Sequence, residues 1–358
     1  MPKDVIVVVD IDAKPSGTES LDILLVSTEG AKDVAVYRDL EDINTAFPKT
    51  KVAEMAAAMF NQGKTTLAET LIRKIKIVGI AAPSGDDDKA KATALVAAIE
   101  TLRETDDDWY IILTDQDGDE AVSALSAWAE ASEPTEAELG AGIEDHRKLY
   151  FGRTANKELA VTNRRSVIIY GDQDTEYPDA AYVGNVGPFY PESVTWKFKR
   201  PQGITVPDLK NSEREALEEA NLNFLTVEYK REYVKNGVCA DGEFIDVQMG
   251  ADYIAKTMRE NLYDIFLENP KIGYTDAGFA IIASGVFRAL NRAVELGIIA
   301  LDTESNQGIF TVVVPKRSAA TDEEARSRKM PDITWEAQLE GAVHSVKVKG
   351  VLRATLSA

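Results

Sequence analysis

Gly63-Lys64-Thr65-Thr66 has the pattern of a phosphate-binding loop, and it is the first candidate for chemistry in this sequence. A P-loop carries a further glycine five residues before the glycine that precedes its lysine, and it joins a strand to a following helix. Here that position holds Ala58, and the segment before Gly63 has the pattern of a helix. We therefore expect no nucleotide to bind at this loop.

The acidic run from Asp115 to Glu120 resembles part of a calcium-binding loop. Such a loop requires an acidic residue five positions before its glycine, Gly118, and Leu113 stands at that position. The run is better explained as a strand-to-helix turn in which aspartates cap the helix.

Histidine and cysteine are too few and too scattered for a familiar catalytic or metal site. The chain has two histidines, His146 and His344, and one cysteine, Cys239, which form no cluster with ligand spacing. The single cysteine excludes an internal disulfide and fits a reducing compartment. We expect no catalytic residue, no cofactor and no metal. A pair of carboxylates acting as acid and base stays open, because the chain has 60 acidic residues to choose from.

The net charge of the chain argues against two classes of binding partner. Its 358 residues include 40 basic and 60 acidic side chains, giving a net charge of −20. A nucleic-acid binder needs a basic face, and an anionic membrane repels this charge, so we expect neither partner. We also expect no signal peptide and no membrane span, and a soluble protein made in the cytoplasm. The length allows two or three domains, and 44% hydrophobic residues are enough to form their cores.

From residue 21 onward, strand and helix patterns alternate. The expected strands are 21–27, 34–37, 74–81, 109–114, 148–152 and 166–170, and the expected helices are 40–47, 52–61, 88–105 and 120–130. Strands separated by helices of this length predict an α/β sheet that is at least partly parallel. The interval 85–145 is strongly acidic, which is typical of a solvated outer face.

Two long amphipathic helices are expected between residues 242 and 300, and this helical pair organises the second half of the chain. Apolar residues recur there in steps of three and four. The first stripe comprises Met249, Tyr253, Ile254, Met258, Leu262, Ile265 and Phe266, and the second comprises Phe279, Ile282, Val286, Phe287, Leu290 and Val294. Asn269-Pro270 ends the first helix, and Thr275-Asp276 begins the second. The pattern predicts a packed helical hairpin.

Several blocks of the sequence, in order and over nearly the whole chain, resemble the tail sheath proteins of contractile bacteriophages and related phage-tail-like particles. They are VYRDLEDINTAFPKTKVAEMAAAMFNQ (36–62), DWYIILTD (108–115), AWAE (127–130), YPDAAYVG (177–184), TWKFK (195–199), GIT (203–205), EANLN (219–223), DGEFID (241–246) and KIGYTDAG (271–278). The resemblance rests on their joint order and spacing, not on any one block.

The resemblance implies a structural role. Sheath subunits polymerise around an inner tube in an extended state, and they contract to drive the tube through the target cell envelope. The implied partners are further copies of the chain, the inner tail tube protein, and baseplate and tail terminator proteins. The implied location is the virion tail or a tail-like particle assembled in the bacterial cytoplasm. The alternative is a soluble α/β enzyme or nucleotide-binding protein with an unrecognised site.

The resemblance also implies terminal arms that add strands to neighbouring subunits. At the N-terminus the candidate strand is Val5, Ile6, Val7, Val8 and Val9. Without the family, the sequence favours the central strand of the first domain for this run, because sequential strands usually pair locally. At the C-terminus, where 335–339 and 343–351 alternate like strands, the candidates are Val343, Ser345, Val346, Val348 and Val351. The alternative there is a hairpin within its own domain.

Four basic residues of the second half are candidates for contact with the tube. They are Arg288 and Arg292, one turn apart on the second long helix, and Lys316 and Arg317 after the strand 310–314. A solvated helix face is the simpler alternative, because exposed basic pairs are common. The acidic interval 85–145 would then face outward.

The expected fold is a mixed α/β (α+β) multi-domain subunit with extended β-arms at both ends. The expected parts are an N-terminal arm (1–20), an α/β sheath domain (21–200), a C-terminal sheath domain with the helical pair (201–334) and a C-terminal arm (335–358).

Overall fold

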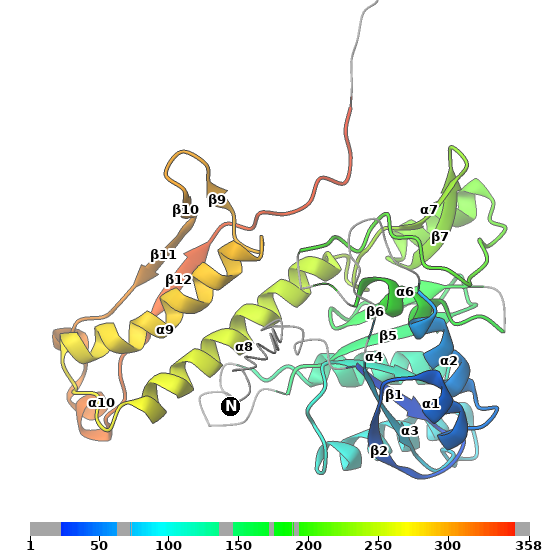
Figure 1. Ribbon diagram of the computed structural model, residues 1–358, viewed down its shortest axis with the longest axis horizontal. Helices are drawn as coiled ribbons and strands as arrows, with labels where there is room; N and C mark the ends of the chain where they lie inside the picture. The colour runs from blue at the N-terminus through cyan, green and yellow to red at the C-terminus, as the bar shows by residue number, and fades with distance from the viewer. Residues whose placement is uncertain are drawn as a thin grey trace, which may run out of the picture.

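The computed structural model describes residues 23–62, 72, 74–135, 146–171, 175–187, 189 and 193–347. Two lobes share one long helix, α8 (Ile245–Glu268) (Figure 1). The α/β lobe contains a mixed sheet with its covering helices, and the C-terminal lobe contains α9 (Asp276–Glu295) with two small ribbons. The fold is therefore mixed α/β, as the alternating patterns predicted.

An eight-stranded sheet forms the centre of the α/β lobe, in the order β2-β3-β1-β4-β5-β6-β7-β8. The six inner strands run parallel, and the two edge strands are antiparallel to their neighbours. The strands are β1 (Ile23–Ser27), β2 (Lys32–Tyr37), β3 (Ile75–Gly79), β4 (Ile111–Thr114), β5 (Leu149–Thr154), β6 (Ser166–Tyr170), β7 (Asn223–Glu228) and β8 (Arg231–Lys235). All ten strands and helices expected between residues 21 and 170 are present.

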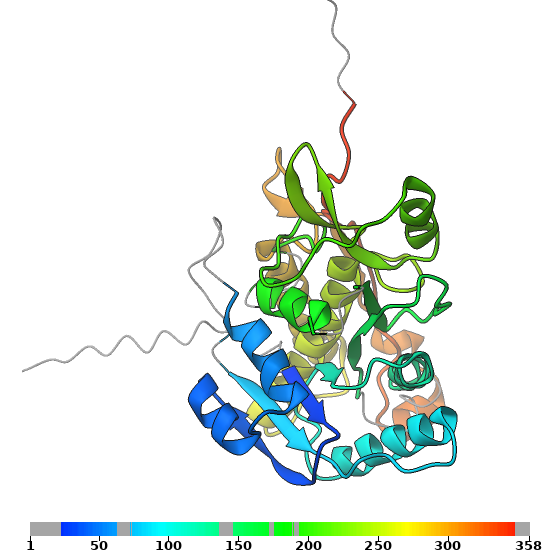
Figure 2. The ribbon, with the colours of Figure 1, turned by 90° about the vertical axis from the view of Figure 1, so that its right-hand side faces the viewer.

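Helices cover both faces of the sheet (Figure 2). Successive side chains of β1 enter opposite cores, because side chains alternate across a strand: Leu25 packs in one and Leu24 in the other. One face carries α1 (Leu40–Ala46), α2 (Lys51–Phe60), α6 (Pro178–Val186) and the first turns of α8. The other carries α3 (Asp88–Arg103), α4 (Asp119–Ala131) and α7 (Asn211–Glu219). Because both faces are covered, the inner strands are mainly apolar, as β4 (IILT) and β6 (SVIIY) show.

The sheet continues past residue 200, where a domain boundary was expected. β7 pairs with β6 in parallel, and the hairpin of β7 and β8 completes the sheet edge. Asn223 holds this region together: its side-chain amide donates to the carbonyls of Ile168 (3.2 Å) and Val238 (2.8 Å). The α/β lobe thus extends to the start of α8.

The C-terminal lobe is built on the contact between α8 and α9. As predicted, α8 ends before Pro270, and the Thr275 hydroxyl caps α9 by accepting from the Gly278 amide (3.2 Å). The helices approach closely at Gly285, where a Cβ atom would lie 2.9 Å from Ile265 Cδ1. The predicted apolar stripe of α8 packs against two different parts of the molecule: Met249 packs against the sheet, whereas Ile254 packs in the C-terminal lobe. Phe266, expected in the stripe, is 56% exposed.

Two short antiparallel ribbons cover the other side of α9. β9 (Leu301–Asp302) pairs with β10 (Gln307–Gly308), and β11 (Phe310–Val313) pairs with β12 (Thr334–Ala337). Between β11 and β12 lie the 3-10 turn η2 (Arg317–Ala319) and the short helix α10 (Asp322–Ser327). Contrary to the sequence expectation, α9 has the length and apolar composition of a membrane span, the one such helix among the described residues. Its apolar side packs against α8 and the β11–β12 ribbon.

Candidate functional site

The carboxyl ends of β1 and β4 are the place where an open parallel sheet would bind a ligand, because the strand order reverses there. In this chain the polar groups at that place bond to one another. The Asp115 carboxylate accepts from the Thr28 amide (2.7 Å) and from the Thr28 hydroxyl (2.8 Å). The Gln116 amide donates to the Thr28 hydroxyl (2.7 Å). These polar groups are therefore engaged within the chain, and a cavity of about 310 Å³ beside them is lined by Gln116, Gly118 and Asp119 together with residues of α3.

The cation nearest these polar groups, Arg153, is also committed to its own chain. Its guanidinium donates to the carbonyls of Thr114 (3.3 Å) and Asp115 (3.2 Å) and pairs with Asp179 (3.1 Å) and Asp117 (3.2 Å). Burial raises the pKa of Asp179, although Arg153 opposes the shift. A perturbed carboxylate is a candidate acid or base, but Asp179 is 1% exposed, so a substrate cannot reach it.

The residues of types that catalyse reactions or bind metals do not lie close together in the structure. His146 contacts Asp107 near the start of β5, Cys239 is buried in the core beneath α8, and His344 lies beside Thr195. Burial raises the pKa of the Cys239 thiol, which disfavours the reactive thiolate. No group of three His, Cys, Asp or Glu side chains within the described ranges is placed to hold a metal ion. The segment 63–66 lies outside those ranges.

The acidic run 115–120 is a strand-to-helix turn, as expected. The residue that caps the helix is not one of the expected aspartates. Gly118 is the N-cap of α4 and makes no side-chain bond, so no aspartate caps the helix. Asp119 and Glu120 lie in the first turn, where the helix dipole favours negative charge.

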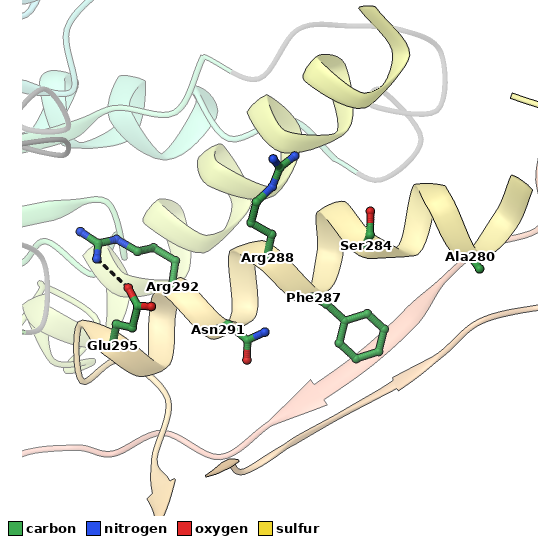
Figure 3. Close-up of a pocket in the computed structure, with 7 residues that line it drawn as sticks. All are labelled: Ala280, Ser284, Phe287, Arg288, Asn291, Arg292 and Glu295. Carbon is green, nitrogen blue, oxygen red and sulfur yellow. Dashed lines mark hydrogen bonds and ion pairs between the residues drawn. The ribbon is translucent and has the colours of Figure 1, made fainter. Parts of the chain in front are cut away.

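Arg288 and Arg292 line a shallow groove of about 640 Å³ on the exposed side of α9 (Figure 3). Arg288 points toward α8, where its guanidinium donates to the Asn261 carbonyl (3.2 Å). Arg292 forms an exposed pair with Glu295 (2.8 Å), and this hydrogen bond raises the pKa of Arg292. Phe287 points to the other side, toward Phe310 of β11, and is 40% exposed. The groove thus combines two cations, one anion and an accessible aromatic ring.

Lys316 and Arg317 lie near the start of α9, at the opposite end of the helix from Arg292. The Arg317 amide donates to the Asp276 carboxylate (2.5 Å), and its guanidinium lies 4.8 Å from the centre of the Tyr274 ring. Asp276 is the first residue of α9, about 24 Å along the helix from Arg292 at 1.5 Å per residue. The four basic residues singled out in the sequence therefore form two separate sites.

The β11–β12 ribbon has two open edges within the described part of the chain, because each strand pairs only with the other. One face of the ribbon packs on α9 through Phe310, Val312 and Ala337. A two-stranded ribbon is marginal alone and presents unpaired backbone groups on both sides. Sequence reasoning found both strands but did not identify the ribbon as an acceptor, since which edges stay open depends on the tertiary pairing.

The candidate arm strands are only partly described. Val5 to Val9, Val348 and Val351 lie outside the described residues. Val343, Ser345 and Val346 are exposed and form no strand within the chain, with Val343 85% and Val346 83% exposed. The hairpin alternative for the segment 343–347 therefore finds no partner strand among the described residues.

This chain matches known proteins by its structure and not by its sequence. No protein-family model matches the sequence, and no curated protein matches it. A chain in the cryo-EM structure of the anti-feeding prophage baseplate aligns with a TM-score of 0.69 and 13% identity, over 99% of this chain and 100% of that one. A chain in the contracted helical sheath of the same prophage aligns with a TM-score of 0.66 and 13% identity, over 98% and 99%.

A sheath tail protein from Listeria innocua aligns more distantly, with a TM-score of 0.51 and 11% identity over 90% of this chain and 96% of that chain. At these identities the likeness establishes the fold, and it does so from end to end. The architecture of this chain, from the parallel sheet to the paired helices and the β11–β12 ribbon, is the fold of contractile tail sheath proteins.

Proposed function

We propose that this chain is the structural subunit of a contractile tail sheath, which polymerises around an inner tube and contracts to drive the tube through a cell envelope. The observation that carries the proposal is the likeness of the whole chain, both lobes included, to chains of the anti-feeding prophage particle. An enzyme that merely shared an α/β sheet would match over the sheet alone.

The proposed subunit has no catalytic role and binds no cofactor. In support, the polar groups of Thr28, Asp115 and Gln116, where an α/β enzyme would hold its ligand, hydrogen-bond to one another. The work of contraction would then come from the difference in free energy between two packings of the same subunits.

Strand addition between subunits is the proposed means of assembly. The open edges of the β11–β12 ribbon are suited to accept a strand, because an extended peptide can complete their unpaired backbone groups. The proposed donors are 5–9 and 343–351 of neighbouring copies. Donor and acceptor are different surfaces of one chain, so the contact is heterologous and yields an open helix or stacked rings.

The inner tube is the proposed partner of the α9 groove. Two arginines gather there on a chain whose net charge is −20, which suits an acidic tube surface. The acidic segments around α3 and α4 would face outward, and baseplate and terminator proteins would close the two ends. The proposed location is a virion tail or tail-like particle assembled in the bacterial cytoplasm, with no nucleic-acid or membrane partner.

Negative-stain electron microscopy of the purified full chain, alone and co-expressed with a candidate tube protein, tests the proposal. Striated tubes or stacked rings wide enough to enclose an inner tube are the expected result. Small closed oligomers under all concentrations and seeding conditions would overturn it and favour an enzyme.

A further inference from the structure

After β12 the chain leaves the C-terminal lobe and returns to the α/β lobe. Its last backbone bond to the C-terminal lobe runs from the Glu340 amide to the Ile298 carbonyl (3.1 Å). The following segment, red in Figure 1, passes above the start of α8, which lies beside the α/β lobe. Four residues after Glu340, His344 contacts three residues of the α/β lobe and the start of α8: Thr195, Phe198 and Phe244.

These three residues form a socket around the imidazole ring. The Thr195 hydroxyl lies 2.7 Å from His344 Nε2. The Phe244 ring stands edge-to-face at 4.6 Å between centroids, and the Phe198 ring does so at 6.3 Å. Edge-to-face packing of this kind adds attraction beyond burial of the ring surface.

The socket is held in place by contacts that do not involve His344. Phe198 has a positive φ of 64°, which is rare for a bulky side chain and requires support from its surroundings. That support comes from the Val234 carbonyl of β8, which accepts from the Phe198 amide (3.1 Å), and from the Tyr233 ring at 5.3 Å. Phe244 is fixed as the N-cap of α8. The backbone of both aromatic residues is therefore held by contacts outside the C-terminal segment, and their side chains are 46% (Phe198) and 40% (Phe244) exposed.

His344 is the one side chain of 341–347 that is not exposed. Its neighbours Val343 and Val346 point apolar side chains into solvent. A segment that bound through general hydrophobic contact would bury these valines first. Attachment therefore depends on a single imidazole.

We propose that Thr195, Phe198 and Phe244 form an anchoring site for the chain's own C-terminal segment, with His344 as the inserted side chain. With the anchor in place, the last attachment of the C-terminal arm to the subunit is on the α/β lobe and not at Glu340 on the C-terminal lobe. It thereby sets the point from which residues beyond 347 reach a neighbouring subunit. This last use rests on the proposed sheath function, whereas the anchor itself is a property of the single subunit.

Limited trypsin digestion of the dilute full chain tests the anchor. Cleavage after Lys347 requires the protease to bind residues around His344, and cleavage after Arg353 serves as an internal reference. We expect His344→Ala to raise the ratio of the two initial rates roughly tenfold or more, the size expected for losing one hydrogen bond and the contacts with Phe244 and Phe198. Thr195→Val should raise it less, and His344→Phe should restore part of the protection.

Ser345→Ala is the matched control, because Ser345 is exposed and adjacent. Equal ratios for the wild type, His344→Ala and Thr195→Val would overturn the anchor. The digestion uses dilute subunits, so its outcome does not depend on whether the chain forms a sheath. Electron microscopy of the unmutated chain decides that question separately.

Discussion

Arg165 and Asp252 form a two-point salt bridge that fastens the first half of α8 to the α/β lobe, with Nη1–Oδ2 and Nη2–Oδ1 distances of 2.8 and 2.9 Å. Arg165 is completely buried. The Tyr110 hydroxyl donates to the same carboxylate (2.6 Å). Burial alone would raise the pKa of Asp252, but the hydrogen bonds and charge of Arg165 hold it below its ordinary value. Because the second half of α8 belongs to the C-terminal lobe, this pair joins the two lobes.

Replacing Asp252 by alanine should lower the free energy of unfolding by about 3 kcal/mol, because the change removes the two-point partner of the fully buried Arg165 and leaves only Glu133 (2.8 Å), among the described residues, to pair with it. Urea denaturation followed by circular dichroism measures this loss. Asp264→Ala, an exposed carboxylate on the same helix, should change the value by no more than about 0.5 kcal/mol. Similar losses in the two variants would mean that the pair does not hold the lobes together.

Such a pair could not be predicted from the sequence. Arg165 and Asp252 are 87 residues apart, and charged residues of these types usually lie on the surface. The six strands up to residue 170 were predicted because their apolar and β-branched runs depend on local sequence alone, whereas β7 and β8 were not predicted. Periodicity likewise gave the apolar side of α8, but it did not reveal that Met249 and Ile254 pack in different lobes.

In the candidate sites, too, the features set by local sequence were predictable and those set by distant contacts were not. Arg288 and Arg292 were predicted to lie together because they are one helical turn apart, and both line the groove. Their separation from Arg317 follows from the path of the loop after β11, which no local pattern encodes. The open edges of the ribbon and the socket around His344 depend on contacts between distant segments, so neither was visible in the sequence.

Gly285 sets how closely α8 and α9 can pack. A leucine there would place its Cβ 2.9 Å from Ile265 Cδ1 and 3.2 Å from Leu262 Cδ2, which forces the helices apart. We expect Gly285→Leu to destabilise the chain by about 1–3 kcal/mol, the usual cost of overpacking. Thermal or urea unfolding measures the effect, and Ser284→Leu, exposed on the same helix, is the control. A Gly285→Leu variant as stable as that control would contradict the close packing.

Charge reversal at Arg288 and Arg292 should weaken assembly of sheath on tube without unfolding the subunit. The two side chains line the exposed groove, so glutamates there would repel an acidic tube surface. Co-expression with the tube protein, scored by electron microscopy, is the measurement. Lys89→Glu with Lys91→Glu on α3 makes the same change in net charge at exposed positions outside the groove. Tails of normal length from the Arg288/Arg292 variant would exclude the groove as the tube contact.

Deletion of residues 1–19 should leave a folded subunit that cannot form a stable sheath. The deletion removes the proposed donor strand 5–9 but none of the described core, which begins at Ile23. Circular dichroism checks the fold, and electron microscopy checks polymerisation. Normal polymerisation and contraction of the truncated chain would show that this arm is not a donor.

The anchor at His344 should release as the pH falls. Burial lowers the pKa of His344, and the charge of Lys197 acts in the same direction. Nδ1 of the ring is buried and has no hydrogen-bond partner among the residues that the structure describes, so a proton there would find no acceptor in that part of the chain. A lowered pKa in the anchored state means that anchoring is strongest above the ordinary histidine value of about 6.5, and that it weakens as the pH drops from there through the lowered value.

NMR titration can follow this directly, since the chain has only two histidines, His146 and His344. We expect the His344 signal to titrate below its ordinary pKa in the wild type and to return toward that value in Thr195→Val. The Lys347-to-Arg353 cleavage ratio should rise between pH 7.5 and 5.5 in the wild type and stay constant in His344→Phe, which keeps an aromatic ring but cannot be protonated. A wild-type ratio that stays constant over this range would show that the imidazole is not the group that holds the segment.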